Sequence, residues 1–259
     1  MARASRMQAR YDTSGPFRAA ALAPGDRYEL HDGHAIYCAP TGGDGARRTV
    51  AGAQVLDTDP AVTETGIDAG YSAGPKDLRA PDVSVGNVPD KPGWIQGVPP
   101  LAVEYAGSGQ DEATLQLKIA DLLGAGTKWI WVVRLLGPRR VEVHERGVPL
   151  RTFGPGEELI APGILQNPVL VEALFDREVA HRFTLRNLLQ REGYQSLDDV
   201  REEGREEGRA RAVLAVLAAR GVPVPDEIAA RILACHEAAT LDGWLRRAAT
   251  AERLSDVLD

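Results

Sequence analysis

The chain has few of the features that mark secreted and membrane proteins. It contains only two cysteines, Cys38 and Cys235, far apart in a sequence of 259 residues. Two cysteines give no disulfide framework and suit a reducing cytoplasm, where we expect the protein to act. No uncharged apolar run reaches the roughly 18 residues that a membrane helix needs. The arginines near the N-terminus are not followed by the apolar stretch of a secretory signal. These absences favour a soluble protein with no membrane partner.

Excess positive charge is also lacking, since the formal net charge is −7. Proteins that coat nucleic acid without sequence preference depend on an excess of Lys and Arg. The charge therefore argues against that class. It does not argue against a nuclease, because a metal site concentrates carboxylates and a basic groove is a local feature.

The composition changes near residue 197. The sequence before it is rich in Gly, Pro and short β-branched runs, whereas the sequence after it has long helical periodicity. The segment Arg201-Glu-Glu-Gly-Arg-Glu-Glu-Gly-Arg is a near-repeat of four residues. Each interior glycine costs a helix roughly 1 kcal/mol relative to Ala, so a charged linker and a helix both remain open here. We predict four parts: a flexible N-terminal segment over 1–19, a core over 20–196, this helix or linker over 197–212, and a small helical bundle over 213–259.

Short apolar runs in the core indicate strands, and one stretch indicates a helix. Strands are expected over 82–85, 101–105, 129–134 and 141–144, with a helix over 111–125 that Asp111 caps and Gly124 and Gly126 end. A further helix is expected over 174–189. This order predicts an α/β fold, with a mixed sheet flanked by helices and a small all-α region behind it. The glycine-rich stretch at residues 42–45 lacks the Lys-Ser/Thr of a phosphate loop and is interpreted as a turn.

Three residues between positions 82 and 118 form the strongest chemical pattern. Asp82 opens one strand, and Glu104 lies within another that is otherwise apolar. Burying a lone carboxylate is costly unless it is paired or binds a metal, and two such acids suit Mg²⁺. Lys118 borders the apolar stripe of the predicted helix, whereas Asp121 on the same helix is predicted to face outward. A zinc site at His31, His34 and Cys38 is disfavoured, because a fourth ligand is missing.

The order of these segments resembles the Uma-type family of restriction endonucleases, whose core is similar to that of the PD-(D/E)XK nucleases. The resemblance covers roughly residues 20–150. It is carried by Tyr28-Glu-Leu-His-Asp-Gly, Ala80-Pro-Asp-Val-Ser-Val, Pro100-Leu-Ala-Val-Glu-Tyr, a helix with an inward Lys, and Lys128-Trp-Ile-Trp-Val-Val.

The resemblance implies a role for each matching residue. Asp82 and Glu104 would bind Mg²⁺ or Mn²⁺ with the backbone carbonyl of Tyr105, and Lys118 would position the attacking water and steady charge on the phosphate. Glu29 matches an acid of the family and either completes the site or is structural. In the wider superfamily the lysine stands two residues after the second acid, at Ala106 here, but the Uma-type pattern places it on the following helix.

These observations predict a metal-dependent endonuclease that hydrolyses phosphodiester bonds in DNA and acts as a homodimer. The alternative is a catalytically inactive nuclease fold that serves as a DNA-binding or protein-interaction scaffold. In either case, the C-terminal helices are expected to contact a second copy or a protein partner.

Overall fold

The computed structural model of the protein describes residues 15–109 and 111–258. These form two compact units, the first ending at Leu188 and the second beginning at Leu189. The flexible segment predicted over residues 1–19 lies outside the described residues as far as residue 14. Within the rest of that segment, Phe17 and Ala19 pack with Leu22, Leu30 and Leu78 in a small apolar cluster.

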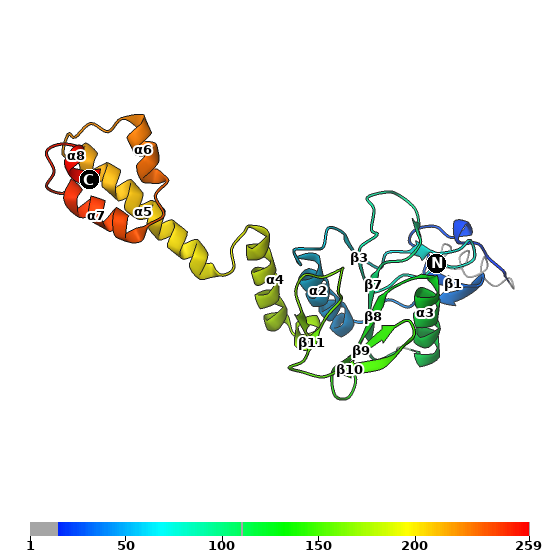
Figure 1. Ribbon diagram of the computed structural model, residues 1–259. Coiled ribbons are helices and arrows are strands. Elements are labelled where there is room, and N and C mark those ends of the chain that lie inside the picture. Colours follow the sequence, from blue (N-terminus) through cyan, green and yellow to red (C-terminus); the bar gives the residue numbers. More distant parts are fainter. Residues whose placement is uncertain (1–14, 110, 259) are drawn as a thin grey trace. The chain divides into compact units, whose positions relative to one another are not determined.

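The first unit is built on a six-stranded mixed sheet (Figure 1). The strand order is β10-β9-β8-β7-β5-β3, and only β7 and β8 run parallel. A parallel pair needs a crossover, and the helix α3 supplies it. The bounds are β3 (Thr65–Ile67), β5 (Val83–Val85), β7 (Leu101–Ala106), α3 (Glu112–Ala125), β8 (Trp129–Arg134), β9 (Arg140–Glu145) and β10 (Val148–Phe153).

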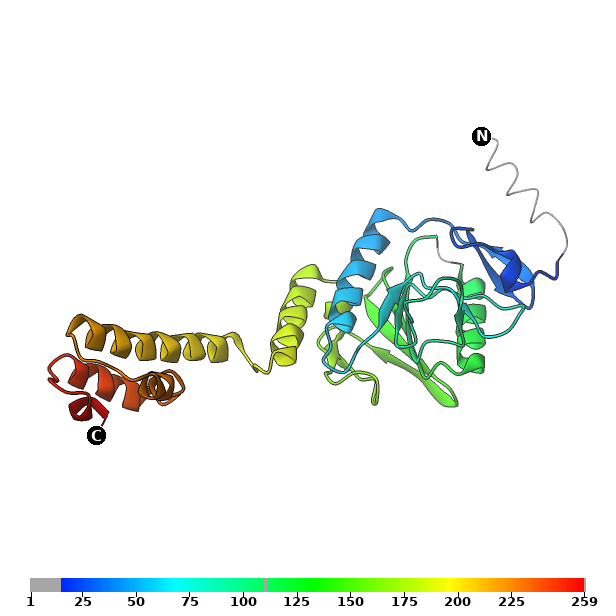
Figure 2. The same cartoon turned by 90° about the horizontal axis from the view of Figure 1, so that it is seen from above.

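Shorter elements surround this sheet. An antiparallel hairpin of β1 and β2 lies beside α3 (Figure 1, Figure 2), and two further two-stranded sheets pair β4 with β6 and β11 with β12. The bounds are η1 (Ala19–Ala21), β1 (Tyr28–His31), β2 (His34–Tyr37), α2 (Gly43–Asp57), β4 (Tyr71–Ser72), β6 (Ile95–Gln96), β11 (Glu158–Leu159), β12 (Val169–Leu170), η2 (Val171–Leu174) and α4 (Arg177–Arg191).

The two faces of the sheet are covered by different helices. Val83, Val103 and Tyr105 point to the face that α2 covers and join the larger core. Because successive side chains of a strand alternate between faces, Ala102 and Ala106 point the other way and pack under α3 with Leu115, Ile119 and Leu122. Glu104 lies between these two alanines and therefore points to the α3 face.

The helix α3 begins and ends where the sequence predicts. The side chain of Asp111 accepts a hydrogen bond from the backbone N–H of Thr114 at 2.7 Å, which caps the first turn. Gly126 adopts a left-handed conformation at φ 116°, which terminates the helix. This capping fixes the phase of the helix and thus the direction of Lys118.

Residues 42–45 form the start of α2, so their interpretation as a turn is wrong. Gly42 is the N-cap, and the helix runs on for 15 residues to Asp57. Tertiary packing overrides the poor local propensity, because Ala51, Val55 and Leu56 are buried against the sheet. Gly52 is required by this packing, since a Cβ at that position would lie 1.9 Å from the hydroxyl oxygen of Tyr105.

The second unit is a small helical bundle around an apolar cluster that includes Val213, Leu217, Ile232, Leu241 and Trp244. The repeat Arg201 to Arg209 is helical and forms part of the longest helix, α5. A capping box at Ser196 and Asp199 starts this helix, which offsets part of the cost of its glycines. None of the helices in the described ranges has the length and apolar character that crossing a bilayer requires. The bounds are α5 (Leu197–Ala219), α6 (Asp226–Leu233), α7 (Ala238–Ala248) and α8 (Ser255–Leu258).

Candidate active site

The register of the sheet places Asp82 and Glu104 next to each other. β5 and β7 are antiparallel, with Val83 opposite Val103. One residue further along the same register, Asp82 lies opposite Glu104. The backbone N–H of Tyr105 donates to Oδ2 of Asp82 at 2.6 Å, which holds the aspartate against β7. The two acids predicted from the sequence therefore meet at one point of the sheet.

Lys118 of α3 reaches the same point. Its Nζ lies 2.9 Å from Oε1 of Glu104 and 3.0 Å from Oε1 of Glu29 on β1, and it donates to the carbonyl oxygen of Ala80 at 2.7 Å. The contact with Ala80 is a hydrogen bond and the other two are ion pairs, and Oε1 of Glu104 has no hydrogen-bond partner among the described residues. The side chain of Lys118 is 12% exposed. The lysine thus lies inside the protein at the carboxylates, as the helical phase predicts.

The pKa values of Glu104, Asp82 and Lys118 are all raised, but burial raises those of the two acids and opposes the rise at the lysine. Burial raises the pKa of Glu104 to about 8; Lys118 opposes this rise, and Asp82 and Glu29 add to it. Burial also raises the pKa of Asp82, against the effects of Lys118 and the Tyr105 N–H. Burial alone would lower the pKa of Lys118, but Glu104, Glu29 and Asp82 outweigh it, so the pKa is raised and the ammonium is retained.

Glu29 is held by two cations and one backbone group. Its Oε2 accepts from Nη1 of Arg79 at 3.0 Å, and its Oε1 accepts from the N–H of Ala80 at 3.3 Å in addition to the Lys118 contact. The residue is 7% exposed. Glu29 therefore lies against Lys118, and its most direct effect is to fix the position of the ammonium.

Arg79 and Asp121 complete this network and were not identified from the sequence. The guanidinium of Arg79, 3% exposed, also donates to Oδ2 of Asp121 from Nε at 2.8 Å, and Nδ1 of His31 lies 2.9 Å from the same oxygen. Asp121 does not face outward as the helical wheel predicts. The helical wheel takes only the packing of α3 on the sheet into account, whereas the β1–β2 hairpin covers this other side of the helix. The sequence does hold one signal for Asp121: it follows Lys118 by about one helical turn, so the two side chains lie on the same side of the helix.

The donors at this point suit a divalent cation chemically. Asp82, Glu104, Glu29, Asp121 and the nearby Asp68 supply carboxylates, and Lys118 and Arg79 offset part of their charge by ion pairing. Carboxylate oxygens are the ligands that Mg²⁺ and Mn²⁺ prefer. Across residues 15–109 and 111–258, however, no group of three or more His, Cys, Asp and Glu side chains is arranged to hold a metal ion. The ammonium of Lys118 lies against Glu104 and Glu29, where a bound cation would compete with it.

Comparison with known proteins gives the family. A family model described as "Putative restriction endonuclease", Uma2, matches residues 16–170, more than half of the chain. The chain belongs to the Uma2 family. The match covers every strand of the central sheet and both helices that cover it, and it ends before α4.

The chain is also similar to a solved structure. It resembles a putative nuclease from Anabaena variabilis with a TM-score of 0.55 and 17% sequence identity, over 62% of this chain and 99% of that chain. At this identity the likeness establishes the fold, a nuclease-like mixed sheet flanked by helices. No curated protein matches the chain.

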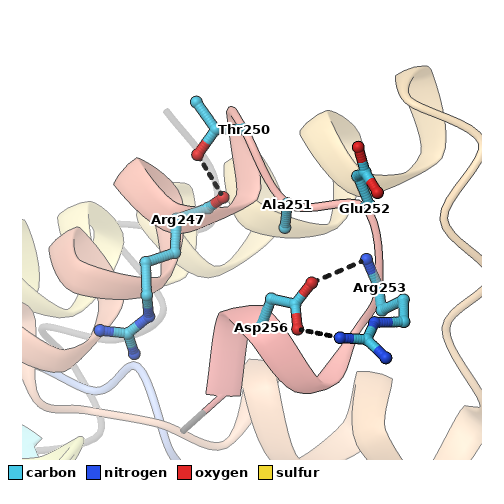
Figure 3. Close-up of a pocket in the computed structure, with 6 residues that line it drawn as sticks. All are labelled: Arg247, Thr250, Ala251, Glu252, Arg253 and Asp256. Atoms are coloured by element: carbon cyan, nitrogen blue, oxygen red, sulfur yellow. Dashed lines mark hydrogen bonds and ion pairs between the residues drawn. The ribbon is translucent and has the colours of Figure 1, made fainter.

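The second unit, which lies outside the Uma2 match, has a hollow of about 600 Å³ (Figure 3). Two of its arginines are engaged locally: Arg247 donates to the carbonyl of Val257 at 2.8 Å, and Arg253 pairs with Asp256 at 3.6 Å. None of the residues predicted for catalysis lies there. The candidate chemistry therefore belongs to the first unit. The hollow is lined by Arg247, Thr250, Ala251, Glu252, Arg253 and Asp256.

Proposed function

We propose that the protein is a metal-dependent endonuclease that hydrolyses phosphodiester bonds in DNA. The observation that carries the proposal is the meeting of Asp82 and Glu104 on adjacent strands, with the ammonium of Lys118 2.9 Å from Glu104. Membership of the Uma2 family and the nuclease-like fold support a hydrolase of this class. A buried carboxylate pair is costly to maintain, and a bound cation would offset that cost.

Asp82 and Glu104 are the proposed ligands of Mg²⁺ or Mn²⁺. A divalent cation at this point supplies Lewis-acid stabilisation of the phosphate and lowers the pKa of bound water. The backbone carbonyl of Tyr105 is a third proposed ligand. In an extended strand the N–H and C=O of one residue point to the same side, and the N–H of Tyr105 points at Asp82.

Lys118 is the proposed positioning and charge-stabilising group. Its retained positive charge suits an anionic phosphate or a polarised water. The ammonium already lies against three protein oxygens, so a contact with the phosphate or the water competes with these contacts. Glu29 is proposed to position Lys118, since it touches the lysine and is fixed in turn by Arg79.

A second candidate function is a catalytically inactive nuclease fold that serves as a scaffold for DNA or protein. The ion pairs of Lys118 with Glu104 and Glu29, and the lack of a preformed metal cluster in the described part of the chain, favour it. The two candidates differ in one property, which is metal-dependent turnover.

Cleavage of supercoiled plasmid in Mg²⁺ or Mn²⁺ tests the proposal. We expect Glu104→Gln to lower the cleavage rate by more than about tenfold to a hundredfold, which is the usual loss when a residue that only supports a metal ligand is replaced. Glu142→Gln is the matched control, because Glu142 is a strand carboxylate at 8% exposure that pairs with Arg134 instead of Lys118. Equal rates for wild type and Glu104→Gln would contradict the assignment.

We also propose that the protein acts as a homodimer, since cleavage of both strands by a fold with one site calls for two copies. The C-terminal helices are the proposed contact, with a protein partner as the alternative occupant. Sedimentation of the full chain, and of a chain ending at Gly193, is expected to show a dimer and a monomer, respectively. A dimer that persists in the shorter chain would move the contact to the first unit.

A further inference from the structure

The first turns of α5 extend beyond α6 and α7 of the second unit (Figure 1, Figure 2). Leu197 is 43% and Val200 37% exposed there, and Gly204 and Gly208 are exposed as well. At about 100° per residue, these four positions lie within about 40° of one line along the helix. The side chains that α5 buries in its own unit, Val213 among them, lie on the opposite side. The helix therefore has a second face without charged residues, here called the outer face.

The charges that border the outer face are sorted by sign. Arg201 and Arg205 lie along one side of it, and Glu203 and Glu207 lie along the other. When two identical helices pair in parallel, opposite sides meet, so the arginines of one copy face the glutamates of the other. In an antiparallel pair each side meets its own counterpart, and arginine would face arginine. The outer face is therefore complementary to a second, parallel copy of itself.

The ion pairs that these charges form within the chain are exposed. Arg205 pairs with Glu202 at 3.0 Å and Glu207 pairs with Arg211 at 2.9 Å, and the four side chains are 47–71% exposed. Exposed pairs of this kind contribute little to stability. Their exchange for ion pairs between two copies is therefore not costly.

The two glycines of the outer face suit a close approach by another helix. Glycine is unfavourable inside a helix, and a Cβ at Gly204 or Gly208 would meet nothing within 4 Å. Packing within one chain therefore does not require glycine at either position. The absence of a Cβ does allow the backbone of a second helix to come close.

We propose that a second copy of the chain packs on the outer face, with the two α5 helices parallel and in register. Leu197 and Val200 of each copy then meet their counterparts, and Arg205 of one copy lies beside Glu207 of the other. Both chains enter the pair at the same end. This inference rests on the proposed homodimer and assigns its contact and direction. It does not depend on the metal site.

Sedimentation of the full chain over a range of concentrations tests the contact. Gly204→Leu improves helix propensity and has room within one chain, so the fold is expected to be kept while the approach of a second helix is blocked. We expect its dimer dissociation constant to rise at least about tenfold. Ala230→Leu is the matched control, because Ala230 is an exposed small residue of α6 away from the outer face, and it is expected to dimerise as wild type does. Circular dichroism verifies that both variants are folded.

A charge exchange tests the direction of the pair. Arg205→Glu and Glu207→Arg each make both sides of the outer face alike in charge, so either variant alone is expected to dimerise about threefold to tenfold more weakly at low salt. An equimolar mixture of the two is expected to recover wild-type affinity as a heterodimer. Unchanged affinity in both single variants would overturn the parallel arrangement. A wild-type dimer constant in folded Gly204→Leu would overturn the outer face as the contact and leave the homodimer to another surface, whereas a monomeric wild type would overturn the homodimer as well.

Discussion

At the scale of single residues, Lys118 connects the two parts of the site. It joins the buried Glu104 of the central strand to Glu29 of the β1–β2 hairpin. Breaking a buried ion pair by removing one partner costs about 3–5 kcal/mol, because the remaining charge is left uncompensated. Alanine at Lys118 is therefore expected to affect folding as well as activity. Isosteric changes at the carboxylates separate the two effects more cleanly.

The raised pKa of Glu104 predicts how stability depends on pH. Its pKa rises from 4.5 to about 8 on folding. A carboxyl group with a raised folded pKa stabilises the folded state below its unfolded pKa, and this contribution is lost as pH rises through the folded pKa. The free energy of unfolding without metal is therefore expected to fall between about pH 4.5 and pH 8.

Chemical denaturation across this pH range, in EDTA, checks the prediction. Glu104→Gln removes the titrating group, so its free energy of unfolding is expected to fall less with pH. Glu142→Gln is expected to keep the pH dependence of the wild type. The same slope in wild type and Glu104→Gln would show that Glu104 is ionised throughout.

At the scale of elements, α2 and β7 fit together through Gly52 and Tyr105. A Cβ at position 52 would lie 1.9 Å from the hydroxyl oxygen of Tyr105, and that hydroxyl donates to the carbonyl of Leu174 at 2.9 Å. Gly52→Ala is expected to destabilise the protein by about 1–3 kcal/mol through overpacking. It should also displace β7, and with it Glu104.

Gly204 and Gly208 of α5 provide the matched control for Gly52→Ala. A Cβ at either of these positions meets nothing within 4 Å. Alanine there is expected to stabilise α5 by about 1 kcal/mol per substitution, because only helix propensity changes. Denaturant unfolding of Gly52→Ala, Gly204→Ala and Gly208→Ala measures whether each substitution lowers or raises the free energy of unfolding. Equal effects at positions 52 and 204 would refute the packing account.

The sequence identifies the parts of the site that depend on local pattern. Asp82 and Glu104 stand out because they are acids at or within apolar strands, and Lys118 follows from the phase of a well-capped helix. Asp68 cannot be found in this way. Its place depends on the register between β5 and a strand of three residues, Thr65–Ile67, which no local pattern specifies.

Tertiary context explains the other differences. The outward prediction for Asp121 is wrong because the hairpin that covers it comes from residues far away in the sequence. The same is true of α2, whose glycine-rich start looks like a turn until the sheet beneath it is known. Both cases involve packing between distant segments, which propensity does not report.

At the scale of the whole molecule, the chain combines a Uma2 unit with a helical unit that the family match does not cover. Catalytic residues are proposed only in the first unit, and assembly is proposed for the second. These roles are separable by experiment, because each unit has its own apolar core.

Calorimetric titration of Mn²⁺ into the wild type and into Asp82→Asn/Glu104→Gln is the most direct test of the central claim, that these acids form a metal-dependent nuclease centre. We expect saturable binding and plasmid nicking by the wild type, with both lost in the folded double variant. A folded wild type that neither takes up Mn²⁺ nor nicks plasmid would exclude a metal-dependent nuclease and leave the scaffold function.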